Sequence, residues 1–133
     1  MAKVTILDTP VVTLWYHPDK KIVHHQIHKF VSGPLFRQFL TAGTEALEKF
    51  RATKWLSDDR ANSVLAQDDL EWSHRTWFPR TARAGWKYWA IVQPGKVLAQ
   101  AAMERLVKEY SAQGVTAQFF TDVEQATRWL ERV

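Results

Sequence analysis

Two hydrophobic periods alternate along this sequence. Residues 11–16 and 22–30 are rich in β-branched and aromatic types, and the segment 17–20 between them has the turn chemistry of His-Pro-Asp-Lys. This pattern predicts an antiparallel hairpin. An apolar stripe with helical spacing follows over 32–50, with a Ser as its candidate N-cap and Pro34 in its first turn. The second pattern predicts a helix that covers the sheet.

The rest of the chain keeps alternating between strand and helix periods. Residues 87–92 form a nearly continuous apolar run, which is typical of a parallel strand buried at the centre of a sheet. Pro79 should kink or interrupt the helix predicted at 68–85. The next predicted helix, which ends at Gly114, should direct Leu98 and Tyr110 inward. The predicted elements after residue 50 are a strand at 54–57, a helix at 68–85, a strand at 87–92, a helix ending at Gly114, a strand at 115–120 and a helix that starts with a capping box at Asp122 and Gln125.

The element order β-β-α-β-α-β-α-β-α predicts an α/β fold. Each connection that contains a helix is longer than the roughly dozen residues that a parallel crossover needs. Right-handed crossovers would then wind the last four strands side by side. We therefore expect a mostly parallel five-stranded sheet, with one hairpin strand antiparallel at its edge.

The composition indicates one folded domain over 1–133. Of the 133 residues, 46% are hydrophobic and 24% charged, as in a folded globular protein. A chain of this length can bury one core but is too short for two independent ones. Seven Trp are many for this length, and an indole buries a large apolar area. We expect burial of Trp55, Trp77, Trp89 and Trp129, and the pattern assures no burial for Trp15, Trp72 and Trp86.

Several classes of protein are disfavoured by the residues that are missing. The lack of Cys removes disulfides, thiolate nucleophiles and Cys-based metal sites, and fits a cytoplasmic location. The first residues lack the apolar region of a signal peptide, and no run reaches the about 18 apolar residues of a membrane span. A net charge of +4 without a clustered basic face does not indicate nucleic-acid binding. We expect no cofactor.

The segments Trp77-Phe78-Pro79 and Gly85-Trp86-Lys87-Tyr88-Trp89-Ala90-Ile91-Val92 resemble the WFP…G-x-KY-x-A-x-V signature of small bacterial SpoIIAA-like proteins, also described as STAS/SEC14-domain proteins. The element order agrees over nearly the whole chain, and 57–60 lies where this family carries a polar segment. The resemblance implies a SpoIIAA-like fold with helices mainly on one face of the sheet. It further implies a STAS-like regulatory or protein-interaction domain or, through SEC14-like domains, binding or transfer of a small apolar, lipid-like ligand.

Sporulation anti-sigma-factor antagonists share this fold and carry a Ser after the third strand, whose phosphorylation switches partner binding. Here Ser57 and Ser63 flank Asp58 and Asp59, but the D-S-S-G-like stretch is missing and the nearby carboxylates would repel a phosphate. Phosphorylation of Ser63 is one hypothesis. The other is that these Ser and Asp residues are caps and turn formers.

A ligand of an open α/β sheet binds at the carboxyl ends of its strands. No G-x-S-x-G elbow and no Gly-rich phosphate loop is present, so we expect no enzyme and assign no catalytic residue. His74 with one of the Asp residues could form an acid–base pair, but its place on an apolar stripe favours a partly buried structural imidazole. The candidate ligand or partner site consists of Ser57, Asp58, Asp59, Arg60, Ser63 and Lys96.

The histidines of the hairpin invite a metal interpretation, which strand geometry disfavours. At about 3.3 Å per residue, His24 and His28 lie roughly 13 Å apart on one face while His25 points to the other. Zinc ligands must converge, so we expect no metal site. The face with His24 and His28 should instead be half-polar or covered by a partner, and Trp15 and Trp72 are further candidate interface residues.

The main expectation is therefore a non-enzymatic regulatory or protein-interaction domain that self-associates as a homodimer or binds another protein. The alternative is a domain that binds a small apolar ligand, and a small enzyme is the least favoured reading.

Overall fold

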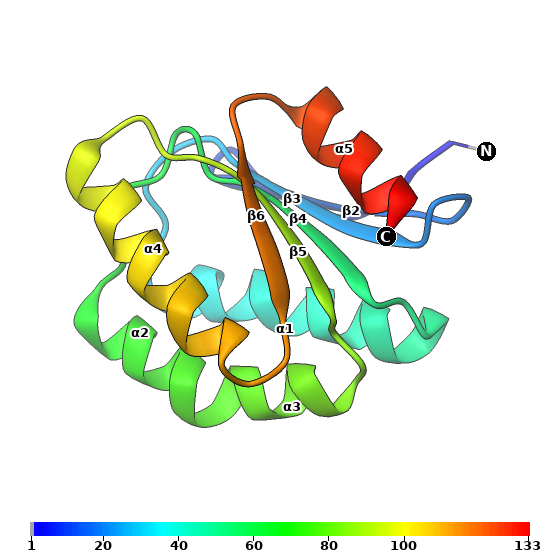
Figure 1. The fold of residues 1–133 in the computed structure, drawn as a ribbon. Coiled ribbons are helices and arrows are strands. Elements are labelled where there is room, and N and C mark those ends of the chain that lie inside the picture. Colours follow the sequence, from blue (N-terminus) through cyan, green and yellow to red (C-terminus); the bar gives the residue numbers. More distant parts are fainter. Residues whose placement is uncertain (1) are drawn as a thin grey trace.

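The computed structural model describes residues 2–133, which form one sheet with helices on both of its faces (Figure 1). The elements are β1 (Val4–Asp8), β2 (Val12–His17), β3 (Ile22–Ile27), α1 (Gly33–Phe50), β4 (Lys54–Asp58), α2 (Gln67–Trp72), the π-helical segment η1 (Ser73–Trp77), α3 (Phe78–Arg83), β5 (Tyr88–Val92), α4 (Val97–Ser111), β6 (Thr116–Phe120) and α5 (Val123–Arg132). The α/β class expected from the sequence is confirmed.

The sheet has six strands in the order β1-β2-β3-β4-β5-β6. β1 pairs antiparallel with β2 and β2 with β3, whereas β3 to β6 pair in parallel. The expected count of five strands is wrong, because β1 adds an edge strand and moves β2 into the interior. The pattern missed β1 because an irregularity between Thr5 and Leu7 breaks its alternation and most of its side chains are exposed.

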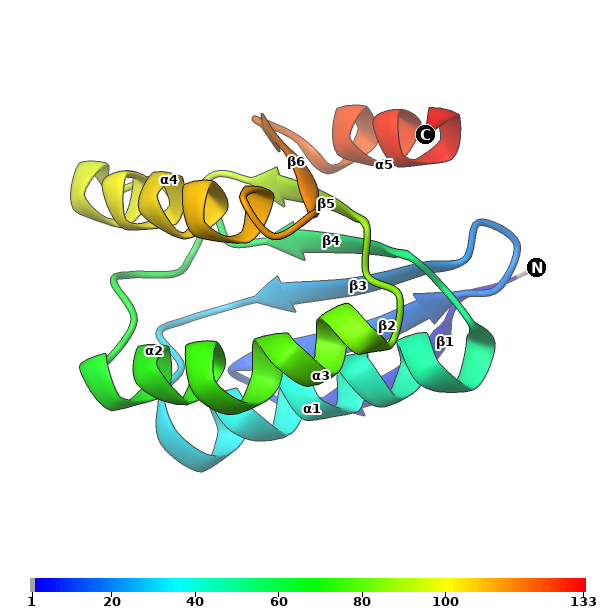
Figure 2. The same ribbon diagram turned by 60° about the horizontal axis from the view of Figure 1, so that its bottom comes forward.

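The helices form two unequal layers. Figure 1 shows α5 on one side of the sheet and α1, α2, α3 and α4 on the other, and in Figure 2 α1 runs beside the α2–α3 segment. As expected, the helices lie mainly on one face of the sheet, and α5 is the exception. Ala126, Trp129 and Leu130 of α5 pack on Leu56 and Ala90 of the central strands. We call the side covered by α1 to α4 the inner face and the other side the outer face.

The expected interruption at Pro79 takes the form of a π-helical segment. α2, η1 and α3 follow each other without a break, and Pro79 lies in the first turn of α3. The backbone N–H of Phe78 donates to the carbonyl oxygen of Ser73, five residues earlier. This wider turn lies directly before a residue that has no N–H and whose ring crowds the preceding turn. Pro79 therefore changes the helical period without ending the helix.

The aromatic residues concentrate in the inner core. Trp77, Trp86 and Trp89 surround Tyr110, with ring centroids between 5.3 and 6.3 Å apart for the contacting pairs. The expected burial of Trp55, Trp77, Trp89 and Trp129 is confirmed, and Trp86 is buried as well. Leu98 differs from expectation, because it is 76% exposed near the start of α4.

Trp55 packs directly on the backbone of α1. Gly43 is the contact point, since a Cβ atom at this position would overlap the six-membered ring of Trp55. The indole is 1% exposed, and its N–H donates to Nδ1 of His25, which restricts how far the ring can move away from Gly43. A glycine inside a helix costs about 1 kcal/mol relative to Ala, and here the close approach of Trp55 explains it.

We predict that Gly43→Ala lowers the free energy of unfolding by about 1–3 kcal/mol, because overlap with a rigid buried ring outweighs the better helix propensity of Ala. Urea denaturation would measure the change. Gly95→Ala is the matched control, since the nearest atom to its added Cβ is Arg60 O at 3.8 Å. Equal stability of the two variants would contradict the prediction.

Candidate functional site

The polar segment predicted as a site is divided between the two faces of the sheet. Successive side chains of a strand point to opposite sides. Ser57 and Asp59 therefore line a cavity on the inner face. Asp58 points outward and forms a two-bond ion pair with Arg60, with N···O distances of 2.9 and 2.7 Å. Only half of this segment can thus contribute to any one site.

A chain of hydrogen bonds beside the cavity joins a residue of β3, a residue of β4 and Asp59, which directly follows β4. The indole Nε1–H of Trp55 donates to Nδ1 of His25 over 3.0 Å, and Nε2 of His25 lies 2.8 Å from Oδ1 of Asp59. Because Nδ1 accepts a hydrogen bond, the ring proton is on Nε2, which donates to the carboxylate. His25 is therefore a neutral imidazole whose orientation is set from both sides.

The parallel pairing of β3 and β4 explains why these residues meet. His25 is the register partner of Ser57, and Asp59 follows two residues later on the same side of the chain. Trp89 on the next strand donates from Nε1 to Oγ of Ser57 over 2.8 Å. Residues that are 30 or more positions apart in sequence thus form one polar line along the cavity floor.

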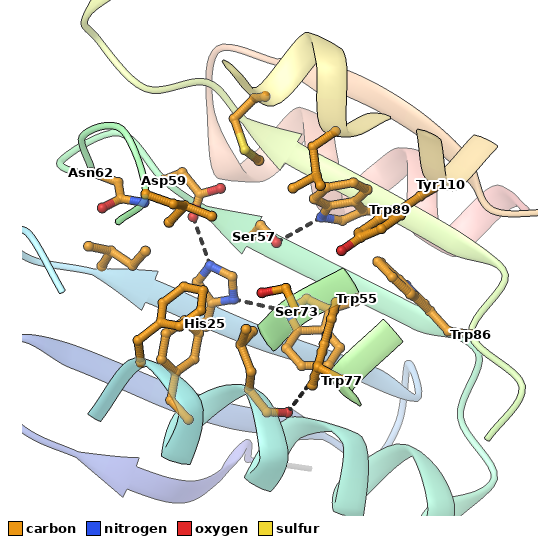
Figure 3. Close-up of a pocket in the computed structure, with 17 residues that line it drawn as sticks. His25, Trp55, Ser57, Asp59, Asn62, Ser73, Trp77, Trp86, Trp89 and Tyr110 are labelled. Carbon is orange, nitrogen blue, oxygen red and sulfur yellow. Dashed lines mark hydrogen bonds and ion pairs between the residues drawn. The ribbon is translucent and has the colours of Figure 1, made fainter. Parts of the chain in front are cut away.

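The cavity lies between the inner face of the sheet and the helices, and it encloses about 60 Å³. Figure 3 shows Asn62 and Asp59 at one end and Tyr110 and Trp86 at the other. Most of its wall is apolar and aromatic. Its lining residues are His25, Ile27, Phe36, Phe39, Leu40, Trp55, Ser57, Asp59, Asn62, Leu65, Ser73, Trp77, Trp86, Trp89, Met103, Leu106 and Tyr110.

Two polar atoms of this wall are buried without a hydrogen-bond partner among the described residues. They are the hydroxyl oxygen of Tyr110 and Oδ1 of Asn62. Tyr110 is 1% exposed and Asn62 is 7% exposed. Burial raises the pKa of Tyr110, so the hydroxyl stays a neutral donor and acceptor. Buried polar groups are nearly always paired, so two exceptions in one cavity require an explanation.

A groove lies next to the cavity. It encloses about 180 Å³ between α4 and the segment 62–74, and Asn62, Leu65, Met103 and Leu106 line both spaces. Nε2 of His74 in η1 lies 3.1 Å from a carboxylate oxygen of Glu109 in α4, so the two side chains join the two helices. Met103 and Leu106 therefore lie between the groove and the cavity.

Three polar side chains of the cavity, those of His25, Ser57 and Ser73, are engaged in hydrogen bonds. Both ring nitrogens of His25 are engaged, so the imidazole has no lone pair free to act as a base. Ser57 accepts from Trp89, and Ser73 donates to the backbone oxygen of Asp69. His74 lies in the groove and not beside Asp58 or Asp59. Within residues 2–133, no group of three His, Cys, Asp or Glu side chains could hold a metal ion.

The other predicted site residues lie elsewhere. Ser63 lines the groove but not the cavity, and Lys96 is exposed at the N-cap of α4. Trp72 is half-buried on the helical layer, with its ring 6.3 Å from that of Phe36 and 5.5 Å from the guanidinium of Arg37. It therefore shares no surface with the remaining interface candidates.

Trp15, His24 and His28 lie on the outer face beside β1, beyond the strands that α5 covers. His24 and His17 are joined through Nδ1 and Nε2 at 3.1 Å, and His28 Nε2 lies 2.7 Å from Oγ1 of Thr13. This face thus carries polar side chains, and His25 lies on the other side, in the wall of the cavity; whether a partner covers the face stays a prediction. Burial, followed by the charges of His17 and His25, lowers the pKa of His24 to about 3.

Sequence reasoning missed the residues that close the cavity. Tyr110 was expected to point inward because of its helical spacing, but nothing in the pattern shows that its hydroxyl lacks a partner. Asn62 lies in a polar segment that reads as a loop, and only the packing of Leu65 and Met103 around it makes it part of a cavity wall.

Comparison with known family models, with curated proteins and with solved structures finds no match to this chain. The likeness to SpoIIAA-like proteins therefore stays a prediction. Across the part of the chain that the structure describes, no helix is long and apolar enough to cross a membrane.

We predict that His24 makes the fold less stable in acid. The pKa of His24 is about 3 in the folded protein, and the ordinary value is 6.5. Between pH 3 and pH 6.5, the unfolded chain therefore binds a proton at His24, whereas the folded chain does not. Stability is complete above pH 6.5 and falls as the pH drops toward 3. The loss from this group is about 3 kcal/mol at pH 4. Other charged groups near His24 are Lys3 and Asp58.

Urea denaturation between pH 4 and pH 7 would measure this effect. His24→Gln should flatten the dependence of the unfolding free energy on pH, whereas His28→Gln, at an exposed position on the same face, should not. Parallel curves for wild type and His24→Gln would show that His24 is not responsible.

We also predict that Tyr110→Phe leaves the unfolding free energy unchanged or raises it by about 1 kcal/mol, because the hydroxyl is buried without a partner. Thr81→Val is the contrasting variant. Its hydroxyl donates to the backbone oxygen of Trp77 over 2.7 Å and lies 2.8 Å from Oγ1 of Thr44, so its loss should destabilise the fold. A Tyr110→Phe protein as unstable as Thr81→Val would mean that the Tyr110 hydroxyl is paired in solution.

Proposed function

We propose that this protein binds a small, mostly apolar ligand in the cavity between the sheet and α4. The observation that carries the proposal is the pair of unpartnered polar atoms, Tyr110 Oη and Asn62 Oδ1, in an otherwise apolar wall. A ligand pocket has this make-up: apolar and aromatic side chains supply affinity, and a few polar groups orient the ligand. Unpaired polar groups lower stability, and a ligand that bonds to them would offset this cost.

The size of the cavity limits the ligand. At about 60 Å³ it is far smaller than the roughly 300–1,000 Å³ of pockets for drug-sized molecules. The ligand is therefore very small or extends past Met103 and Leu106 into the groove. Met side chains adapt their shape readily, so Met103 can move without loss of helical structure. Of the 15 residues of α4, only Ala99 and Tyr110 are buried, so few side chains anchor this helix.

From the sequence, we expect mainly a regulatory or self-associating domain, with binding of a small apolar ligand as the alternative. This proposal favours the alternative. Binding of an apolar ligand is what a SEC14-like resemblance implies, but the cavity residues support it without that resemblance. A regulatory or self-associating role through the outer face stays a prediction. On that face Thr13 bonds to His28 and His17 bonds to Nδ1 of His24, while Nε2 of His24 is buried without a hydrogen-bond partner among the described residues and lines neither the cavity nor the groove.

Titration of the wild-type protein with 2-phenylethanol, followed by calorimetry and by ligand-observed NMR, tests the proposal. We expect saturable binding with one site. Met103→Trp should weaken it by about tenfold or more, equivalent to about 1.4 kcal/mol, because the larger ring fills the passage from the groove. Lys108→Trp is the control, since this exposed position on the same helix lines neither space.

Indole and 1-hexanol extend the test to other shapes. If none of the three compounds binds at millimolar concentration, the proposed function is wrong. Equal weakening by Met103→Trp and Lys108→Trp would place the binding outside the cavity and would also contradict it.

A further inference from the structure

One end of the cavity presents hydrogen-bond acceptors. Asp59 and Asn62 meet there, and the backbone N–H of Asn62 donates to the carbonyl oxygen of Asp59 over 2.9 Å (Figure 3). His25 engages Oδ1 of the Asp59 carboxylate and leaves the second carboxylate oxygen for another donor. Oδ1 of Asn62 has no partner. The Asn62 amide also offers N–H donors, and a ligand group that donates hydrogen bonds would satisfy the two acceptors, Oδ1 of Asn62 and the second oxygen of Asp59.

No cationic side chain of the described residues lines this cavity. Its wall contains neither Lys nor Arg, and His25 is neutral because it accepts a hydrogen bond from Trp55. The nearby Arg60 is held by Asp58 on the outer face, and Arg37 bonds to Asp69. The single carboxylate of Asp59 therefore sets the sign of the local charge, which repels an anionic ligand and attracts a cationic one.

The number of donors distinguishes an ammonium from a hydroxyl. An ammonium has three N–H donors and no acceptor, so it can satisfy both Asp59 and Asn62 at once. A hydroxyl has one donor and can satisfy only one of them. Hydrogen bonds between charged groups are also roughly twice as strong as those between neutral groups.

The aromatic part of the cavity wall suits the apolar part of a ligand that carries an ammonium group. Trp55 and Trp77 stand nearly perpendicular, with an angle of 86° between their planes and 5.6 Å between their centroids. Trp86 and Trp89 are inclined by 60°. Rings at such angles present both edges and faces to the cavity, and indole faces attract cations as well as apolar groups.

We infer that the ligand is a primary amine with a small apolar or aromatic body, whose ammonium group lies between Asp59 and Asn62 and whose body extends toward Trp89 and Tyr110. This inference rests on the proposed function and gives the chemical class of its ligand. No Lys or Arg among the described residues lines the cavity, so the carboxylate of Asp59 would receive its counter-charge from the ligand.

Three compounds with the same body test the inference: 2-phenylethylamine, 2-phenylethanol and phenylacetate, titrated calorimetrically at pH 7. We expect the amine to bind about tenfold or more tightly than the alcohol, and the acid not to bind. Asp59→Asn should remove the preference for the amine and leave the affinity for the alcohol unchanged. The Asn amide oxygen can still accept from His25, so the hydrogen-bond chain is retained.

Asp58→Asn is the matched control, because it removes the neighbouring carboxylate from the outer face and should leave the preference intact. Asn62→Leu serves as a second variant if Asp59→Asn does not fold, and it should lower the affinity for the amine more than that for the alcohol.

The outcomes separate the two proposals. An alcohol that binds as tightly as the amine, or a preference that survives both Asp59→Asn and Asn62→Leu, overturns the amine inference and leaves apolar ligand binding standing. Absence of binding by both the amine and the alcohol overturns the proposed function as well.

Discussion

The indole of Trp55 is the group on which the inner side of the sheet depends. Its ring lies against the backbone of α1 at Gly43, and its N–H donates to His25. The first contact sets the distance between helix and sheet. The second places the imidazole proton on Nε2, directed at Asp59. Through this one side chain, the position of a helix and the protonation of a buried histidine are coupled.

The wall of the cavity contains two buried polar atoms without a hydrogen-bond partner among the described residues. Tyr110 and Asn62 each lower the stability of the ligand-free fold, since a buried polar group without a partner costs free energy. The π-helical segment beside them, η1, supplies Ser73 and Trp77 to the same wall. Irregular helical turns and unpaired groups of this kind concentrate at functional sites in proteins. Their coincidence here is the observation that supports the proposed binding function.

Much of the fold could be predicted, because local signals agreed with the tertiary structure. The turn at 17–20 gives the hairpin, Asp122 accepts from the backbone N–H of Gln125, and the apolar run 88–92 is a central parallel strand. β1 could not be predicted, because an exposed edge strand with a broken register carries no burial pattern. For the site, 57–60 was predicted as one unit, but strand alternation divides it between two faces.

The sequence by itself determined the hydrophobic periodicity of the strands and helices and the large number of Trp residues. It also determined that most side chains at inward positions are uncharged. The tertiary structure decided which polar residues meet. His25 and Asp59 are distant along the chain and become neighbours only because β3 and β4 pair in parallel with His25 opposite Ser57. Hydrophobic periodicity is a local property that each segment carries alone, whereas the register between two strands depends on both of them and on the helix that connects them.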